Sequence, residues 1–341
     1  MLDDVIRYNL PQVFSIFNYD TIEAYNIKLT RDAELDIDED ISKSLVDKLS
    51  KGIKNRQVGE PVRFVYDDEM PKDMRMLIEK KMKLQKSDNL IPGGRYHNFK
   101  DYIAFPQIGN SKLLNPSMPP LANKDLEGVS SIIDVIKKKD VACFYPFQKF
   151  DYVIDFLRQA AIDPNVTTIK INIYRVANNS RIINALVNAA KNGKDVTVLI
   201  ELRARFDEHN NIKWSRELED EGVKVHFGLR GLKIHSKLIM VKRKEGRGEN
   251  TYVHVGTGNF HEKTAKIYSD ASLLTSDKRI ANDIEKVFDF IERPYINKRF
   301  NNIIISPYNT RSKFIRLINQ EIRNARKGKT AKITIKLNNF N

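Results

Sequence analysis

The residues whose types and spacing best suit a chemical reaction are a histidine and a lysine two positions apart, His235 and Lys237. They lie on an apolar run, and the turn Gly256-Thr257-Gly258-Asn259 follows one predicted strand later. Residues i and i+2 of a strand point to the same face, so we expect His235 and Lys237 to project together. Imidazole is a nucleophile near neutral pH, and a nearby ammonium neutralises charge that develops on a phosphate under attack. Because glycine lets the backbone approach an anion and an amide can donate to it, the pattern predicts phosphoryl chemistry at His235, Lys237 and Asn259.

Three arginines follow predicted strands and could extend this site. Arg175 comes after one strand, and Arg203 and Arg205 come after the next. Ligands of open α/β sheets bind beyond the carboxyl ends of strands, and arginine holds phosphate in a bidentate manner. Together with His235, the arginines predict a phosphate pocket. The alternative is that each arginine pairs with a neighbouring carboxylate, such as Glu201, Asp207 or Glu208.

Two other side chains are weaker candidates. An exposed Tyr268 could stack on a nucleotide base, although a tyrosine packed on the sheet is the commoner case. His254 is expected to be a hydrogen-bonded sheet histidine, with a catalytic or orienting role as the second possibility. The sequence has no zinc spacing, no EF-hand loop and no P-loop motif. Any Mg²⁺ is therefore expected to arrive with nucleotide phosphates and not in a protein cage.

Composition limits the class of protein and its partners. The chain has 341 residues and a net charge of +14, with a pI of about 9.5. This balance suits polyanions such as nucleic acid, anionic membranes or phosphate polymers, or else it only serves solubility. Cys143 is the only cysteine, which fits a reducing compartment. The sequence has no apolar run long enough for a transmembrane helix and no secretory signal, and its composition is that of a soluble protein.

The order of predicted elements indicates an α/β protein. Residues 62–66 alternate like a strand and residues 71–85 have the pattern of a helix, before a proline-punctuated linker near 106–120. From about residue 140, strands alternate with helices, and Ser180 and Gly193 mark the two ends of one helix. This alternation predicts a mainly parallel sheet flanked by helices.

The last part of the chain holds too few elements for a domain. Residues 303–306 and 333–337 have strand patterns, and Thr310 could cap an amphipathic helix between them. Its inward residues would be Phe314, Leu317, Ile318 and Ile322. We therefore expect domains at 1–121, 122–302 and 303–341, the first and last of them truncated, and we find no internal repeat.

The motifs around His235 resemble those of a known family. His235-x-Lys237 with Gly256-Thr-Gly-Asn259 resembles the half-site of the phospholipase D superfamily. The wider context is similar to the bacterial polyphosphate kinases that use a phospholipase-D-like site and a phosphohistidine. The catalytic motifs that carry this likeness are Ile173–Ala177, Glu201–Glu208, Lys233–Lys237, Gly256–Phe260 and Glu262–Ala265. Residues 29–34, 61–66 and 91–100 resemble the head domain of that family, so the likeness runs almost end to end.

The resemblance implies a fold, a reaction and a location. The fold would be a phospholipase-D-like α/β domain after an α+β head-domain remnant. The reaction would be reversible transfer of the ATP γ-phosphate to inorganic polyphosphate through phosphorylated His235, with Lys237 and Asn259 holding the phosphoryl group. Magnesium would lie near Arg175 and Arg205 through shared phosphate oxygens, and the segment of Tyr268 and Asp270 would contact ATP or ADP. The resemblance also implies a homo-oligomer at full length, no specific nucleic-acid partner, and a cytoplasmic location with at most peripheral attachment to the inner membrane.

Three departures from the patterns matter. Lys242 stands where the phospholipase D motif has an aspartate, which argues against plain phosphodiesterase chemistry. Family members are also longer, with a helical domain before the head domain and a second catalytic half that supplies another histidine. We therefore expect this chain alone to be inactive or nearly so. The alternatives are a phospholipase-D-type phosphodiesterase or nuclease and a non-catalytic module that binds polyanions.

Overall fold

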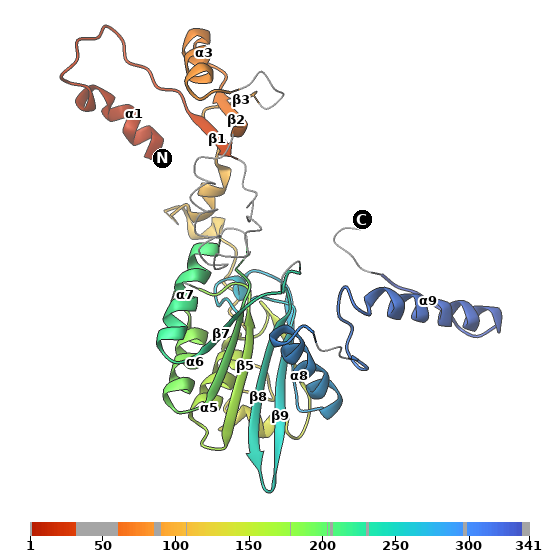
Figure 1. The fold of residues 1–341 in the computed structure, drawn as a ribbon. Coiled ribbons are helices and arrows are strands. Elements are labelled where there is room, and N and C mark those ends of the chain that lie inside the picture. The colour runs from red at the N-terminus through yellow and green to blue at the C-terminus, as the bar shows by residue number, and fades with distance from the viewer. Residues whose placement is uncertain are drawn as a thin grey trace. The chain divides into compact units, whose positions relative to one another are not determined.

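The computed structural model describes residues 2–31, 61–84, 90–106, 108–177, 179–202, 204, 207–229, 232–295 and 299–335 (Figure 1). The chain divides into two compact units, Met1–Pro116 and Ser117–Asn341. Arg203, Arg205 and Leu337 lie outside the described residues, as do the last residues of the 29–34 motif. The boundaries expected at residues 121 and 302 stay predictions.

The first unit contains a small mixed sheet. Its strands are β1 (Ile27–Arg31), β2 (Pro61–Asp67) and β3 (Leu90–Gly93), in the order β1-β2-β3. The helices are α1 (Leu2–Val13), α3 (Lys72–Lys81) and the 3₁₀ segments η1 (Phe99–Ala104) and η2 (Ser111–Leu113). Phe64, Tyr66 and Met70 form its buried core, because alternate residues of β2 point inward. The predicted strand at 62–66 is confirmed, and the predicted helix at 71–85 is confirmed over Lys72–Lys81.

The second unit is built around a larger sheet whose strands are ordered β4-β10-β9-β8-β5-β6-β7. The strands are β4 (Val141–Tyr145), β5 (Val166–Ile173), β6 (Asp195–Ile200), β7 (Lys224–Phe227), β8 (Lys237–Glu245), β9 (Gly248–Gly256) and β10 (Asp270–Thr275). The helices are α4 (Ile132–Ile136), α5 (Asp151–Ile162), α6 (Arg181–Lys191), α7 (Glu208–Asp220), α8 (Lys278–Glu292) and α9 (Thr310–Arg326), with a 3₁₀ turn η3 (Thr264–Lys266). Helices α5, α6 and α7 pack beside β5, β6 and β7, and α8 lies against β8 and β9 (Figure 1).

Local sequence signals explain several of these boundaries. The Ser180 side chain accepts a hydrogen bond from the Ile183 amide at 3.5 Å and so caps α6. Gly193 and Gly222 follow α6 and α7 with φ of 75° and 80°, in the left-handed region that favours glycine. The predicted ends of α6, at Ser180 and Gly193, are confirmed.

The sheet is not mainly parallel, so this part of the fold prediction is wrong, whereas the α/β class is confirmed. Only β5–β6 and β6–β7 pair in parallel, and the pairs β5–β8, β8–β9, β9–β10 and β10–β4 are antiparallel. The reason is the short connection between β8 and β9, where Glu245 pairs directly with Gly248. Only antiparallel strands can be joined by so short a turn, and the strand pattern alone gave no sign of that geometry.

The last segment differs from prediction in three ways. Residues 303–306 and 333–335 are not strands. Asn309 and not Thr310 precedes α9, and its side chain accepts a hydrogen bond from the Ile305 amide and donates to the Ile303 carbonyl. The Asn309 amide thus takes up backbone groups that a neighbouring strand would otherwise bind. The apolar residues expected to face inward from α9 are instead exposed: Phe314, Leu317, Ile318 and Ile322.

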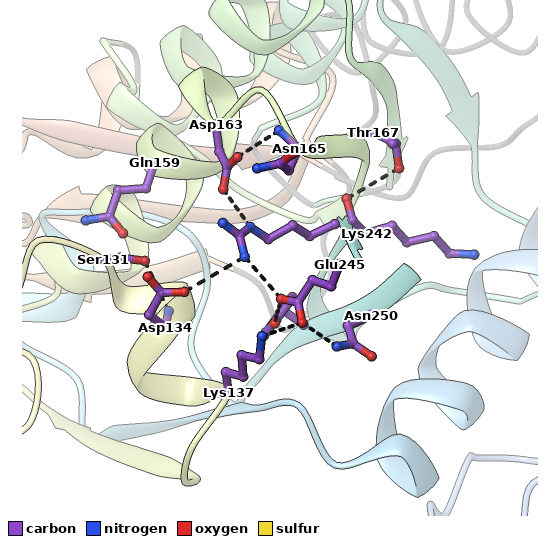
Figure 2. Close-up of polar contacts among 12 residues, drawn as sticks. Ser131, Asp134, Lys137, Gln159, Asp163, Asn165, Thr167, Lys242, Glu245 and Asn250 are labelled. Atoms are coloured by element: carbon purple, nitrogen blue, oxygen red, sulfur yellow. Dashed lines mark hydrogen bonds and ion pairs between the residues drawn. The ribbon is translucent and has the colours of Figure 1, made fainter. Parts of the chain in front are cut away.

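A polar network joins the hairpin end of β8 to the helices beside it (Figure 2). Arg243 pairs with Asp163 at 2.8 Å and with Glu245 at 3.1 Å. Glu245 also forms an ion pair with Lys137 and accepts hydrogen bonds from Asn250 and Tyr252. Lys242 pairs with Glu285 of α8 at 2.5 Å. Arg243 and Lys242 therefore each have a carboxylate partner at this end of the strand. Among the described helices, none is both long enough and apolar enough to cross a membrane.

Candidate active site

His235 lies just before a strand and not within one. Strand β8 begins at Lys237, so His235 occupies the extended segment that enters the sheet, and its side chain is exposed whereas that of Lys237 is buried. The expectation that His235 lies within a strand is therefore wrong, but both side chains contact the Tyr174 ring, so the expectation that they project together is confirmed. The structure nevertheless brings them together, because the Lys237 ammonium donates a hydrogen bond to the His235 carbonyl oxygen.

A tyrosine ring forms the centre of the site. The edge of the His235 imidazole meets the Tyr174 ring at 4.8 Å between centroids, in a T-shaped contact. Three cationic groups lie over or near the same ring, with distances to its centroid of 5.1 Å for Lys237, 5.4 Å for Lys233 and 5.5 Å for Arg175. A ring face attracts cations, so Tyr174 helps to keep like charges close to the histidine. Sequence reasoning assigned no role to Tyr174 or Lys233, although they lie within the motifs Ile173–Ala177 and Lys233–Lys237.

The surroundings of His235 favour the neutral form of its imidazole. Partial burial lowers the pKa of His235 below its ordinary value, and the positive charges of Lys237, Lys233 and Arg175 lower it further. Burial also lowers the pKa of Lys237 to about 8, with Arg175 adding to the effect and Asp270 opposing it. A neutral imidazole carries the lone pair that nucleophilic attack requires.

The first predicted arginine is present beside the site. Arg175 follows β5 and lies near Tyr174, and it also forms an ion pair with Asp207 at 2.7 Å. The carboxylate pairing is therefore confirmed, and Arg175 also adds positive charge near His235, while phosphate binding by this residue stays a prediction. Arg203 and Arg205 lie outside the described residues, so their roles stay predictions.

The glycine-rich turn lies against β8 and β10. Gly256 pairs with Lys237 in the sheet, and a side-chain carbon at Gly258 would come within 2.6 Å of the Asp270 carboxylate. Thr257 donates a hydrogen bond to that carboxylate at 2.8 Å. Gly258 therefore makes room for Asp270, whose charge acts on Lys237. The side-chain oxygen of Asn259 is buried without a hydrogen-bond partner among the described residues.

The remaining candidates differ in accessibility. His254 is 1% exposed and its Nε2 lies 2.7 Å from the Ser272 hydroxyl, while burial lowers its pKa to about 3. This is the environment of a hydrogen-bonded sheet histidine, the first of the two alternatives. Tyr268 is 61% exposed, so its ring is free to receive a ligand.

The described residues do not fit a resident magnesium ion. They include no group of three or more histidine, cysteine or acidic side chains that could hold a metal. Arg175 and Lys237, the polar groups nearest to His235, are cations and do not ligate Mg²⁺. The metal expectation therefore rests on phosphate oxygens of a substrate.

A cavity of about 600 Å³ adjoins His235 and Lys237. Its other walls are mainly apolar and come from α8 and from residues 303–308. Ile303 and Ile305 pack on the same apolar cluster as Leu238 of β8 and Ile284 of α8. The polar site thus lies at the edge of a hydrophobic wall.

The geometry defines a class: an α/β domain with an exposed histidine and several cations beyond the ends of its strands. Comparison with known proteins specifies it further. The families "Polyphosphate kinase middle domain", "Polyphosphate kinase C-terminal domain 1" and "Polyphosphate kinase C-terminal domain 2" match residues 1–105, 131–298 and 303–341. The chain belongs to the polyphosphate kinase family.

Individual relatives agree with this assignment. Polyphosphate kinases of Vibrio parahaemolyticus and Escherichia coli are 51% and 46% identical over the whole chain, which covers 49% and 50% of their own lengths. A crystal structure of polyphosphate kinase from Porphyromonas gingivalis covers 96% of this chain with 32% identity and a TM-score of 0.77, and 47% of that protein is matched. The chain therefore spans about half the length of the relatives it matches.

Proposed function

We propose that this chain carries the nucleophile of a polyphosphate kinase. The reaction is reversible transfer of the ATP γ-phosphate to inorganic polyphosphate, with phosphorylated His235 as the intermediate. The observation that carries the proposal is the exposed imidazole beside Tyr174, held in its neutral form by partial burial and by neighbouring cations. Family membership supports the same substrates.

The reaction has two balanced steps. A lone pair on the His235 ring attacks the γ-phosphorus, the bond to the β–γ bridging oxygen breaks, and ADP leaves. A terminal oxygen of polyphosphate then attacks the phosphorus, the bond to nitrogen breaks, and neutral His235 is restored. Phosphoryl transfer needs mainly positioning and positive charge around the equatorial oxygens. Lys237, Lys233 and Arg175 lie where they can supply that charge.

The other candidates receive supporting roles under this proposal. The side-chain amide nitrogen of Asn259 donates to the transferring group, and the exposed ring of Tyr268, with Asp270 two residues on, contacts the nucleotide. Arg205 and Arg175 share phosphate oxygens with Mg²⁺, which arrives bound to ATP. The net charge of +14 suits a long polyanionic product and predicts binding that weakens with salt. A cytoplasmic location and assembly of the longer protein into homo-oligomers complete the proposal.

One observation weighs against diester cleavage. Lys242, at the place of the phospholipase D aspartate, pairs with Glu285 at 2.5 Å and lies 3.8 Å from Glu249. The position therefore serves the packing of α8 against β8 and contributes a cation where the diesterase motif has an acid. The phosphodiesterase alternative thus lacks one of its motif residues in this chain.

The test uses a chain of the relatives' length, hereafter the full-length protein, because the present chain spans about half of that length. After brief exposure to ATP and Mg²⁺, mass spectrometry under mildly alkaline conditions should find a phosphoramidate on the peptide that contains His235. His235→Ala should abolish it, and His226→Ala, which changes a histidine of β7, should not. Unmodified His235 in an enzyme that still lengthens polyphosphate would overturn the proposal.

A further inference from the structure

Strand β8 separates from its neighbour just before it reaches the nucleophile. Strands β5 and β8 pair from Val166 and Arg243 as far as Ile171 and Ile239. Beyond that point β8 continues to Lys237 beside β9 alone, where Lys237 pairs with Gly256. The backbone groups that lead to His235 consequently need other partners, because buried amide and carbonyl groups are costly when unpaired.

Asn172 supplies those partners on one side of His235. It is the next residue of β5 after the last ladder pair, and it is 1% exposed. Its side-chain oxygen accepts a hydrogen bond from the Leu238 amide at 2.6 Å. Its side-chain nitrogen donates to the Ser236 carbonyl oxygen and, at 3.0 Å, to the Ser236 hydroxyl. The side-chain amide of Asn172 therefore supplies the donor and the acceptor that the backbone of β5 would supply if the ladder continued.

Glu201 performs the matching task on the other side. It follows β6, is 2% exposed, and accepts a hydrogen bond from the Ile234 amide at 2.7 Å. Asn211 of α7 donates to the Glu201 carbonyl at 2.9 Å and to the Tyr174 carbonyl at 3.1 Å, which ties the ends of β5 and β6 together. Gly228 leaves space for the carboxylate, since a side-chain carbon there would lie 3.2 Å from it.

We infer that Asn172 and Glu201 are positioning residues for phosphorylation of His235, an inference that rests on the proposed function. Their hydrogen bonds fix the backbone at residues 234, 236 and 238, which alternate with His235 and Lys237. The two reacting side chains are thereby held toward Tyr174 while the strand itself is free to leave the β5 ladder. A displacement of about 1 Å in a reacting group can slow a reaction by about 10²-fold. The hydrogen bonds of Asn172 and Glu201 therefore control the rate of His235 phosphorylation, although neither side chain touches the substrate.

The first readout is structural and independent of the kinase reaction. Amide hydrogen exchange is measured on the full-length protein with Asn172→Leu, which removes both functions of the amide, and with Asn172→Asp, which keeps the acceptor and loses the donor. Exchange across residues 234–238 should accelerate by about tenfold or more in Asn172→Leu and by less in Asn172→Asp. Unchanged exchange in Asn172→Leu would overturn the inference.

The second readout is kinetic. Asn172→Leu should lower kcat by about 10–100-fold while KM for ATP changes less than about threefold, because the substrate contacts are retained. Glu201→Gln, which keeps an acceptor for the Ile234 amide, should retain most of the rate that Glu201→Leu loses. A loss confined to KM, or no rescue by glutamine, would contradict a positioning role.

Asn123→Asp is the matched control. Asn123 is buried, donates to the carbonyl of Ala142 in β4 at 3.1 Å and accepts from the Asp125 amide at 2.9 Å, and β10 and β9 separate β4 from β8 in the sheet. The Asn123→Asp variant should have a lower free energy of unfolding, with no change in amide hydrogen exchange at residues 234–238 or in kcat per folded molecule. If wild-type His235 is never phosphorylated, the proposed function fails, and hydrogen exchange then decides alone whether Asn172 holds this segment.

Discussion

The two ends of strand β8 treat positive charge in opposite ways. At the hairpin end, Arg243 has Asp163 and Glu245 as partners, within the network of Figure 2. At the other end, Lys237 lies over the Tyr174 ring and donates to a backbone carbonyl. The same strand thus carries a cation network paired with carboxylates and, a few residues away, Lys237 over an aromatic ring that it shares with Lys233 and with Arg175, the partner of Asp207.

The difference separates a structural role from a binding role. A cation that is paired with carboxylates fixes neighbouring elements but has little remaining attraction for an anion. Cations gathered around a ring and a neutral histidine keep their field available for an incoming phosphate. The pKa shifts of the two cations have opposite directions and agree with this view. The pKa of Lys237 is lowered to about 8, whereas the pKa of Arg243 is raised, mainly by its hydrogen bond to Asp163.

The strongest test of the comparison removes the charge of Lys237. In the full-length protein, Lys237→Met should slow phosphorylation of His235 by ~10²–10³-fold, because one group that stabilises transition-state charge is lost. Stability should not fall, since a buried cation that forms no ion pair within the described part of the chain is replaced by an apolar side chain of similar length. Phosphoenzyme formation and thermal unfolding are measured side by side.

Lys244→Met is the control on the same strand, because Lys244 is exposed and lies near the hairpin. It should change neither the rate nor the melting temperature. A large loss of stability in Lys237→Met with an unchanged rate would reverse the roles assigned to the two ends.

The second test removes a carboxylate from the network at the hairpin end of β8. Burial alone would raise the pKa of Glu245, but hydrogen bonds from Lys137, Tyr252, Asn250 and Arg243 lower it to about 2. Glu245→Gln should therefore reduce the free energy of unfolding by about 2–3 kcal/mol at pH 7, with no change in the phosphorylation rate per folded molecule. Urea unfolding of both proteins measures the difference.

The pH dependence of that difference has a defined sign. A carboxylate whose pKa is lower in the folded state contributes its stability above the unfolded value, and the contribution disappears as the pH falls through the folded value. The gap between wild type and Glu245→Gln should hence close between pH 5 and about 2. Glu217→Gln, at an exposed position of α7, should show no such gap.

The third test concerns the titration of the cation-rich end. The kcat/KM for His235 phosphorylation should fall on the acid side, at a pH below the usual histidine value, because the lowered pKa keeps the imidazole neutral until then. It should fall again as Lys237 loses its proton near pH 8, by about tenfold per pH unit beyond that point. Lys237→Met should keep the acid limb and lose the alkaline one, and an alkaline limb that survives would point to another group.

Part of this arrangement could be predicted from residue order. Ser180 and Gly193 bound α6 as expected, because caps and left-handed turns depend on local chemistry. The association of His235 with Lys237 was also predicted from their spacing, although His235 lies just before the strand and not within it. The antiparallel half of the sheet was missed, since pairing between distant strands leaves no local signal.

The roles of Asn172 and Glu201 in positioning the site could not be predicted from the sequence for the same reason. Asn172 looks like an ordinary polar residue in an isoleucine-rich strand, and only the divergence of β8 from β5 gives its amide two partners. Glu201 was considered only as a partner for arginine, whereas its carboxylate also accepts the Ile234 amide across 33 positions of sequence. Tertiary geometry, and not residue type, assigns both roles.

The smallest expected effect comes from Lys242, between the two ends of the strand. Its pair with Glu285 lies near the surface, so Lys242→Met should cost about 0.5–1 kcal/mol of stability and leave phosphorylation unchanged. Lys242→Asp restores the residue type of the phospholipase D motif but places an acid beside Glu285 and Glu249, which should cost somewhat more. If Lys242→Asp instead acquired activity on a phosphodiester without nucleotide, the side chain would reach the site, and the boundary between the two halves of β8 would have to move toward the hairpin.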